Sequence, residues 1–221
     1  MRSPLPQRKE GRVLADWIVA SLREAILQGY FESGEKLDQG RIAEDLEVSR
    51  TPVREALKQL EAEGFIEIRS HRGAYITKVT PEDVHDVFEI RQIIESEVIR
   101  QVTPVIPEKV LDELEEKARM EAIIDSAAEP IKHYEFDTYF HDSILGFTKN
   151  KLFKETLITL NNRIIRVRYF ALVQPGSHLT LSEDEHIKIV NAMRTRDPEA
   201  ASNAMKLHLQ NSAKRIQEFL V

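Results

Sequence analysis

Residues 48–57 read VSRTPVREAL, and this stretch decides the fold of the amino-terminal part of the chain. Ser49 can cap a helix, because its side-chain oxygen is able to accept a hydrogen bond from a backbone N–H of the first turn. Pro52 is compatible with that first turn, since the N–H groups there have no partner within the helix. The pattern therefore predicts a helix from Ser49 to about Glu63.

One face of this predicted helix is apolar and the other is polar. The apolar positions recur at helical spacing and comprise Val53, Ala56, Leu57 and Leu60. The opposite, solvent-facing side carries Arg50, Thr51, Arg54 and Lys58. A helix with this polar face, preceded by a second short helix, is typical of a helix-turn-helix whose exposed side enters the major groove of DNA.

The flanking sequence completes a winged helix-turn-helix. A support helix is predicted from apolar residues at helical spacing, and it ends at Gly29: Val13, Leu14, Trp17, Ile18, Leu22 and Ile26. Asp38 can cap the short second helix. Residues 65–68 and 74–79 read as strands around a turn at residues 70–73, which predicts the wing.

These motifs resemble the amino-terminal domain of GntR-family bacterial transcription regulators over residues 12–80. The resemblance is carried by VSRTPVREAL, Leu60, Glu63-Gly64 and Arg72-Gly73-Ala74. It implies a double-stranded DNA operator as partner, with contacts from Arg41, Ser49, Arg50, Thr51, Arg54, Lys58, His71, Arg72 and Gly73. Gly40 offers no side chain to a phosphate, so we assign that backbone contact to Arg41. A palindromic operator with two half-sites requires a homodimer.

Charge and composition narrow the class of protein. The net charge of the 221 residues is −6, but residues 1–80 hold 13 Lys/Arg and 13 Asp/Glu, whereas residues 81–221 hold 18 and 24. DNA affinity must therefore come from locally placed basic residues, including Arg69 and an Arg8-Lys9 arm. Cysteine is absent, which excludes thiolate metal ligands. No apolar run suits a membrane span or a signal peptide, so we expect a cytoplasmic protein without a membrane partner.

The helical pattern changes character near Pro81, which predicts a second domain. We expect a flexible arm at 1–11, the winged domain at 12–80 and an all-α antiparallel bundle of about six helices at 81–221. The segments are separated by Pro and Gly breaks and cover 82–102, 107–127, 130–147, 150–173, 182–196 and 198–220. The fold class is thus mainly α, with strands only in the wing.

A carboxylate and three imidazoles in this second part suit a divalent metal. Asp137 and His141 lie one helical turn apart on the same face, while His186 and His208 stand beside apolar, core-facing residues of two later helices. Residues of these types can converge on one ion and leave positions open for water or a ligand. A lone His on an apolar stripe is more often a hydrogen-bonded core residue, so spacing alone does not decide.

The context of these residues resembles the FCD effector-binding domain over about residues 81–221. The motifs are Phe136-Asp137 with Phe140-His141, Asp184-Glu185-His186, and Asp197-Pro198 running to His208-Leu209. In metal-binding members the ligands are one Asp and three His, which implies Asp137, His141, His186 and His208 here, with zinc foremost and nickel or manganese as alternatives. His133 reads as a partly exposed bystander or an extra ligand, and His85 and His178 read as surface residues.

Arg91 interrupts an apolar stripe and therefore needs a partner. It either forms an i,i+4 ion pair with Glu95 or clamps the carboxylate of an effector near the metal, since the resemblance implies a small organic or sugar acid. The two roles are compatible. Arg163, Arg166 and Arg168 form a basic run, of which one facing the cavity would assist an acid.

Three functions fit these features. The leading one is a dimeric transcription regulator, of repressor type, that responds to a small carboxylate bound through a metal. A second keeps the regulator but makes the metal itself the signal. The third is a helical metalloenzyme fused to a DNA reader, since three His and an Asp can also activate water. A fused reader and the lack of an additional acid or base at suitable spacing favour a regulator over an enzyme.

Overall fold

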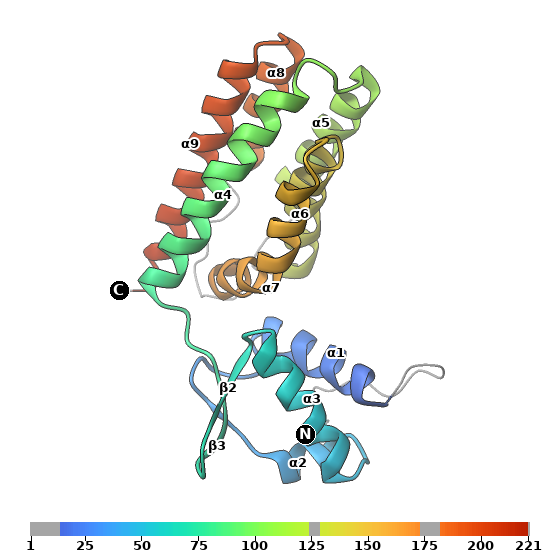
Figure 1. Cartoon of the computed structure of the whole chain (residues 1–221), viewed down its shortest axis with the longest axis vertical. Helices are drawn as coiled ribbons and strands as arrows, with labels where there is room; N and C mark the ends of the chain where they lie inside the picture. Colours follow the sequence, from blue (N-terminus) through green and yellow to red (C-terminus); the bar gives the residue numbers. More distant parts are fainter. Residues whose placement is uncertain (1–13, 124–128, 173–181, 221) are drawn as a thin grey trace. The chain divides into compact units, whose positions relative to one another are not determined.

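The computed structural model describes residues 14–123, 129–172 and 182–220, and the chain divides into two compact units, Met1–Val79 and Thr80–Val221 (Figure 1). The expected arm at 1–11 lies outside the described residues. The winged unit contains α1 (Leu14–Leu27), β1 (Lys36–Leu37), α2 (Gln39–Asp45), α3 (Arg50–Ala62), β2 (Ile66–Arg69) and β3 (Gly73–Ile76). This is the expected winged helix-turn-helix with its β-hairpin wing.

Local sequence explains how the winged unit is built. The Asp38 carboxylate caps α2 by accepting hydrogen bonds from the backbone N–H groups of Gly40 and Arg41. The apolar stripe of α3 is fully buried and packs against α1. One detail of this unit differs from expectation. Ser49 is the N-cap residue of α3 but makes no side-chain capping hydrogen bond.

The wing also belongs to a larger sheet than the sequence predicts. The order of its strands is β1-β3-β2, and both pairings are antiparallel. The pairing of Lys36 with Tyr75 and of Leu37 with Ala74 adds β1 to the hairpin. A two-residue strand carries too few residues to show an alternating pattern, which is why only its tertiary partner reveals it.

The second unit is an all-α bundle, as expected. Its described residues form α4 (Pro81–Val102), α5 (Glu108–Ala122), α6 (Pro130–Gly146), α7 (Lys151–Leu172), α8 (Ser182–Arg194) and α9 (Pro198–Gln217). α4 and α9 run side by side along the bundle (Figure 1). Thr80 opens α4 with a capping box, in which the Thr80 hydroxyl and the Asp83 carboxylate each accept a backbone N–H. None of the helices in the described ranges combines the length and the apolar character that a membrane span requires.

Candidate metal centre and nucleic-acid interface

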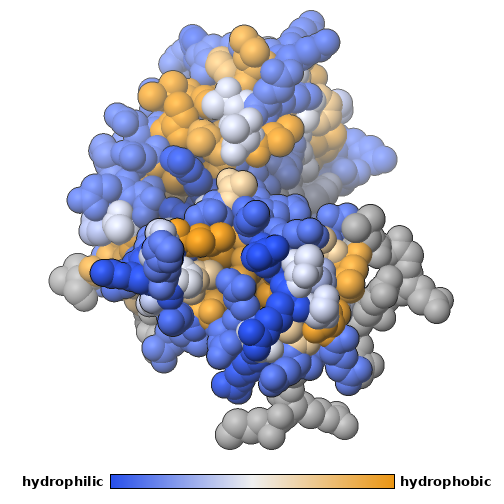
Figure 2. Space-filling view, turned by 60° about the horizontal axis from the view of Figure 1, so that its bottom comes forward, coloured by the Kyte–Doolittle hydropathy of each residue, from blue (hydrophilic) through white to orange (hydrophobic). Residues whose placement is uncertain are grey.

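The predicted DNA-contacting residues lie on the surface of the winged unit. Arg50, Thr51, Arg54 and Lys58 are exposed on α3, beside the exposed N-cap residue Ser49 and with Arg41 exposed on α2. His71 and Arg72 are exposed in the turn between β2 and β3. Hydrophilic side chains dominate the face of this unit that is turned forward in Figure 2. The contacts expected of α2, α3 and the wing are therefore all sterically available.

The wing tip has the backbone geometry that its sequence favours. Gly73 has φ of 109°, a conformation that L side chains rarely adopt, and His71 has φ of 59°. The Arg72 N–H donates to the Arg69 carbonyl at 3.0 Å and closes the turn. Gly73 therefore contributes through its backbone, while His71 and Arg72 present side chains.

Gly40 lies in a crowded position beside Arg50 and Asp38, which the sequence alone does not indicate. A Cβ at this position would lie 3.1 Å from Nη2 of Arg50 and 3.2 Å from the Asp38 carboxylate. Backbone hydrogen bonds from Arg41 and Gly40 lower the pKa of Asp38, and the charge of Arg50 adds to that effect. The glycine thus leaves room for the Arg50 guanidinium to lie beside the start of α2.

The four predicted metal ligands come together within the second unit. Asp137 and His141 project from α6, His186 from α8 and His208 from α9, and one ligand atom of each lies within 4.8 Å of the others. Nε2 of His141 is 3.3 Å from Nε2 of His208 and 3.8 Å from Oδ2 of Asp137. Nε2 of His186 is 3.7 Å from Oδ1 of Asp137. Ligand atoms about 2.0–2.2 Å from a zinc ion lie roughly 3–4 Å from one another, so these separations suit a metal.

Nδ1 of each imidazole lies close to the carboxylate of a glutamate. Nδ1 of His186 is 3.0 Å from Glu121 on α5, Nδ1 of His208 is 2.9 Å from Glu185 on α8, and Nδ1 of His141 is 2.5 Å from Glu95 on α4. An ionised carboxylate only accepts hydrogen bonds, so Nδ1 of His186 and Nδ1 of His208 must each carry a proton. The Nε2 lone pairs of His186 and His208 therefore point toward the shared centre, which is the arrangement that orients histidine ligands around a metal.

Burial keeps two of the imidazoles in the neutral form that binds a metal. It lowers the pKa of His186, and it lowers that of His208 well below its ordinary value, despite the opposing effect of Glu121 and Glu185. Burial alone would raise the pKa of Glu185, but hydrogen bonds from His208 and Arg215 lower it to about 2. His186 and His208 are thus neutral near neutral pH, and Glu185 beside His208 is ionised.

Two observations indicate that these residues fit a cation. Nε2 of His186 is fully buried and has no hydrogen-bond partner. Nε2 of His208, whose Nδ1 donates to Glu185, faces Nε2 of His141 at 3.3 Å, a separation that suits two nitrogens bound to one ion. A buried acceptor without a donor is costly, and a cation placed among the lone pairs removes that cost. The donor set of three nitrogens and a carboxylate oxygen suits zinc, nickel or manganese.

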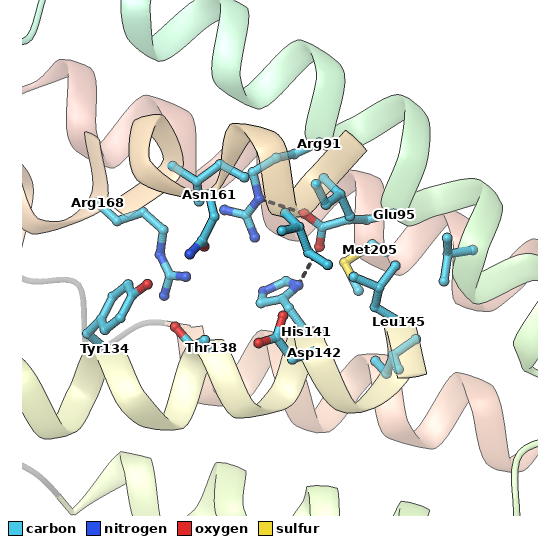
Figure 3. Close-up of a pocket in the computed structure, with 15 residues that line it drawn as sticks. Arg91, Glu95, Tyr134, Thr138, His141, Asp142, Leu145, Asn161, Arg168 and Met205 are labelled. Carbon is cyan, nitrogen blue, oxygen red and sulfur yellow. Dashed lines mark hydrogen bonds and ion pairs between the residues drawn. The ribbon is translucent and has the colours of Figure 1, made fainter. Parts of the chain in front are cut away.

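A cavity of about 130 Å³ borders this centre at His141 (Figure 3). Two guanidiniums line it, that of the buried Arg91 and that of the partly buried Arg168. Arg91 donates from Nε to Oε1 of Glu95 at 2.6 Å, and Arg168 on α7 forms an ion pair with Oδ2 of Asp137. Burial, and then the like charge of Arg91, lowers the pKa of Arg168 to about 10. Arg91 therefore makes its expected ion pair and also faces the space in which an effector would lie.

His133 differs from its expected character. It is buried rather than partly exposed, with Nε2 3.3 Å from Oε1 of Glu121. Burial lowers the pKa of His133, with the charge of Glu121 opposing this shift. It is not among the four converging ligands, and it contacts the glutamate that supports His186. His85 is exposed on α4, as expected, and His178 lies outside the described residues.

Sequence reasoning missed the glutamates behind the histidines and the partner of Arg168. Glu121 and Glu185 carry no signal of their own, because each is one of many acidic residues on a polar-looking helix. Glu95 was recognisable only as a partner for Arg91 at i,i+4 spacing. Arg168 was one of three arginines in the basic run, and only packing shows that it turns inward to Asp137, whereas Arg166 pairs with Asp83.

Comparison with known proteins places both units in established families. Residues 14–76 match the model of bacterial regulatory proteins of the gntR family, and residues 86–211 match the FCD domain. The chain is 30% identical over 199 residues to the HTH-type transcriptional repressor RspR of Escherichia coli K12, covering 89% of this chain and 86% of that protein. It is 29% identical over 224 residues to the Exu regulon transcriptional regulator of the same organism, covering 92% and 84%.

Solved structures agree on the fold. A putative GntR transcriptional regulator from a Rhodococcus species superimposes with a TM-score of 0.75 at 21% identity, covering 92% of this chain and 97% of that one. Escherichia coli McbR/YncC gives a TM-score of 0.71 at 18% identity, covering 95% and 100%. The family and these relatives are transcriptional regulators, which sets the metalloenzyme interpretation aside. The chain therefore belongs to the GntR family of bacterial regulatory proteins, in the branch that carries an FCD domain.

Proposed function

We propose that this regulator is a metal-dependent repressor that binds a palindromic operator as a homodimer and responds to a small carboxylate. The observation that carries the proposal is the convergence of three imidazoles and Asp137 beside a cavity lined by Arg91 and Arg168. A divalent metal supplies a Lewis acid that attracts a carboxylate, and the two guanidiniums supply hydrogen-bond donors of matching charge. Zinc is the foremost candidate, with nickel and manganese as alternatives.

The winged unit supplies the operator contacts in this proposal. The exposed face of α3 enters the major groove with Arg50, Thr51, Arg54 and Lys58, and Ser49 and Arg41 meet phosphates near its start. The wing places His71 and Arg72 on the flanking groove, with Gly73 shaping the turn. A relative with 30% identity is named a repressor, which supports the direction of regulation.

This proposal requires that effector binding in the helical unit be coupled to operator binding by the winged unit. A ligand shifts operator binding only by its differential affinity for the DNA-bound and DNA-free arrangements, typically about 1–3 kcal/mol. The FCD-like unit holds the metal and the cavity within one helical bundle, and the chain continues from β3 directly into its first helix, α4. We infer that repacking around the ligand is transmitted through this connection to the two readers of the dimer.

The test measures operator affinity by fluorescence anisotropy with apo protein, metal-loaded protein and metal-loaded protein plus acid. His186→Ala should lose metal and the acid response while still binding operator, since His186 lies far from the winged unit in sequence and within another compact unit. His85→Ala, which removes an exposed imidazole from α4, is the matched control. A full acid response in His186→Ala would refute the role of the metal in sensing.

A second function is that the metal itself is the signal. The observation that favours it is the ion pair between Arg168 and Asp137, because a metal bound to Asp137 would change that contact without any acid. The same titration decides between the two. A change in operator affinity on adding metal alone, with no further change on adding acids, supports metal sensing.

A further inference from the structure

The cavity beside the metal centre has two chemically different ends (Figure 3). Arg168, Tyr134 and Thr138 gather at one end, whereas Leu145 and Met205 line the other. Val98, Ile144 and Leu157 also line the cavity and are buried. An occupant that satisfies both ends must carry a polar head and an apolar body.

The size of the cavity limits that body. Its volume is about 130 Å³. An apolar cavity of roughly 150 Å³ holds benzene, so the space here suits a body of about six to eight non-hydrogen atoms. The polyhydroxylated ring of a sugar acid would place several hydroxyls against the apolar wall, and burying a hydroxyl without a hydrogen-bond partner is unfavourable.

The charges around the cavity favour one carboxylate rather than two. Glu95 and Asp142 line it between the polar and apolar ends (Figure 3). Arg91 is already paired with Glu95 in the bundle. A second carboxylate on the ligand would lie near these acidic groups, against the leucine and methionine wall, or beside Arg91, whose charge Glu95 already offsets.

Arg168 contacts the candidate metal centre directly. Oδ2 of Asp137 is its ion-pair partner, and Asp137 is also one of the four converging ligands. A divalent ion at Asp137 competes with Arg168 for the same carboxylate and repels its positive charge. The guanidinium, which already lines the cavity, is then available to an incoming anion.

We propose that the cavity binds a small monocarboxylate with a compact apolar body, of the branched aliphatic or benzoic acid type, and that Arg168 holds its carboxylate once a metal has taken Asp137. The inference rests on the proposed function and narrows its effector from organic or sugar acids in general to this class. It also assigns Arg168 as the carboxylate anchor, with Arg91 remaining paired to Glu95.

The first test is isothermal titration of the zinc-loaded full chain with five acids. Benzoate and 3-methylbutanoate should bind at least ten-fold more tightly than acetate, succinate and D-galacturonate. Equal or tighter binding of D-galacturonate or succinate overturns the inference while leaving a carboxylate-responsive regulator intact. Absence of binding by all five overturns both the inference and the carboxylate part of the proposed function, while operator binding and metal content remain separately measurable.

The second test uses variants at the apolar end. Leu145→Asn should weaken benzoate at least five-fold and leave acetate within two-fold, because acetate has no body to contact that wall. Ile158→Asn, at an exposed residue that also lines the cavity, repeats the test where folding is not at risk. Leu152→Asn, on the same helix as Ile158 but outside the cavity lining, is the control. Unchanged benzoate affinity in both cavity variants overturns the placement of the ligand's apolar body at this end of the cavity.

The third test distinguishes a role of Arg168 in binding the ligand carboxylate from a merely structural role. Arg168→Gln should weaken benzoate at least ten-fold while metal affinity stays equal or rises, since a competing positive charge has been removed. Arg163→Gln removes an exposed charge from the same helix and should change neither quantity. A fall in metal affinity in Arg168→Gln would show that Arg168 only positions Asp137. It would overturn the proposal that Arg168 binds the ligand carboxylate in place of Asp137.

Discussion

Glu121 is a buried residue that contacts two histidines of the second unit. It is 2% exposed, and its two carboxylate oxygens lie 3.0 Å from Nδ1 of His186 and 3.3 Å from Nε2 of His133. Its position behind His186 fixes the tautomer of that ligand and the direction of its lone pair. Supporting groups of this kind typically change metal affinity about 10–100-fold when they are removed.

We therefore predict that Glu121→Gln lowers metal affinity about 10–100-fold, because the amide no longer accepts from Nδ1 with a full charge. Competition against a chromogenic chelator measures the dissociation constant. Glu116→Gln, an exposed residue on the same α5, should leave it unchanged. Equal metal affinity in Glu121→Gln and in the unmodified protein would contradict the supporting role.

At the scale of elements, α3 and the wing should contribute to DNA binding in different ways. α3 exposes Arg54 one turn from the helix start, where a side chain meets a base edge, whereas Arg72 sits in the turn of the wing. Arg54→Ala should cost about 1–3 kcal/mol at the operator and little on unrelated DNA. Arg72→Ala should weaken both DNAs alike and reduce the salt slope by about 1.

Anisotropy titrations on operator and random duplexes, at several salt concentrations, separate these effects. Arg119→Ala removes an exposed charge from α5 of the other unit and serves as the control. If Arg54→Ala weakens both duplexes equally, α3 does not read bases at that position. If Arg72→Ala leaves the salt slope unaltered, the wing does not meet phosphates.

At the scale of the whole molecule, the candidate metal centre involves each described helix of the second unit, α4 to α9. Its ligands come from α6, α8 and α9, their glutamates from α4, α5 and α8, and the partner of Asp137 from α7. A metal that binds only the folded state stabilises it by about 2.7 kcal/mol when the free metal is 100-fold above the dissociation constant. That stabilisation belongs to Thr80–Val221.

Chelation should therefore destabilise the helical unit and spare the winged unit. Hydrogen exchange measured with and without chelator should show faster exchange in α6, α8 and α9 and unchanged exchange in α1 and α3. A calorimetric scan should show the transition of the helical unit move to lower temperature on chelation. Uniform loss of protection in both units would mean that they unfold as one, contrary to this expectation.

The sequence by itself determined the elements and the family. The ten residues from Val48 to Leu57 combine a cap position, an early proline and an apolar stripe, all of which are local features that fix a helix wherever it packs. Proline and glycine breaks likewise separated the helices of the bundle. The four candidate metal ligands were identified from the resemblance and their motifs, with only the Asp137–His141 pair supported by spacing.

Only the tertiary structure decided what surrounds those residues. β1 becomes a strand because β3 lies beside it. Gly40 lies against the Arg50 guanidinium, which leaves little room for a side chain at that position. Glu121 and Arg168 reach the metal centre from helices that are distant in sequence, so no periodicity marks them. The physical reason is that caps, turns and helical stripes depend on neighbours along the chain, whereas burial, ion-pair exchange and the shape of a cavity depend on which helices pack together.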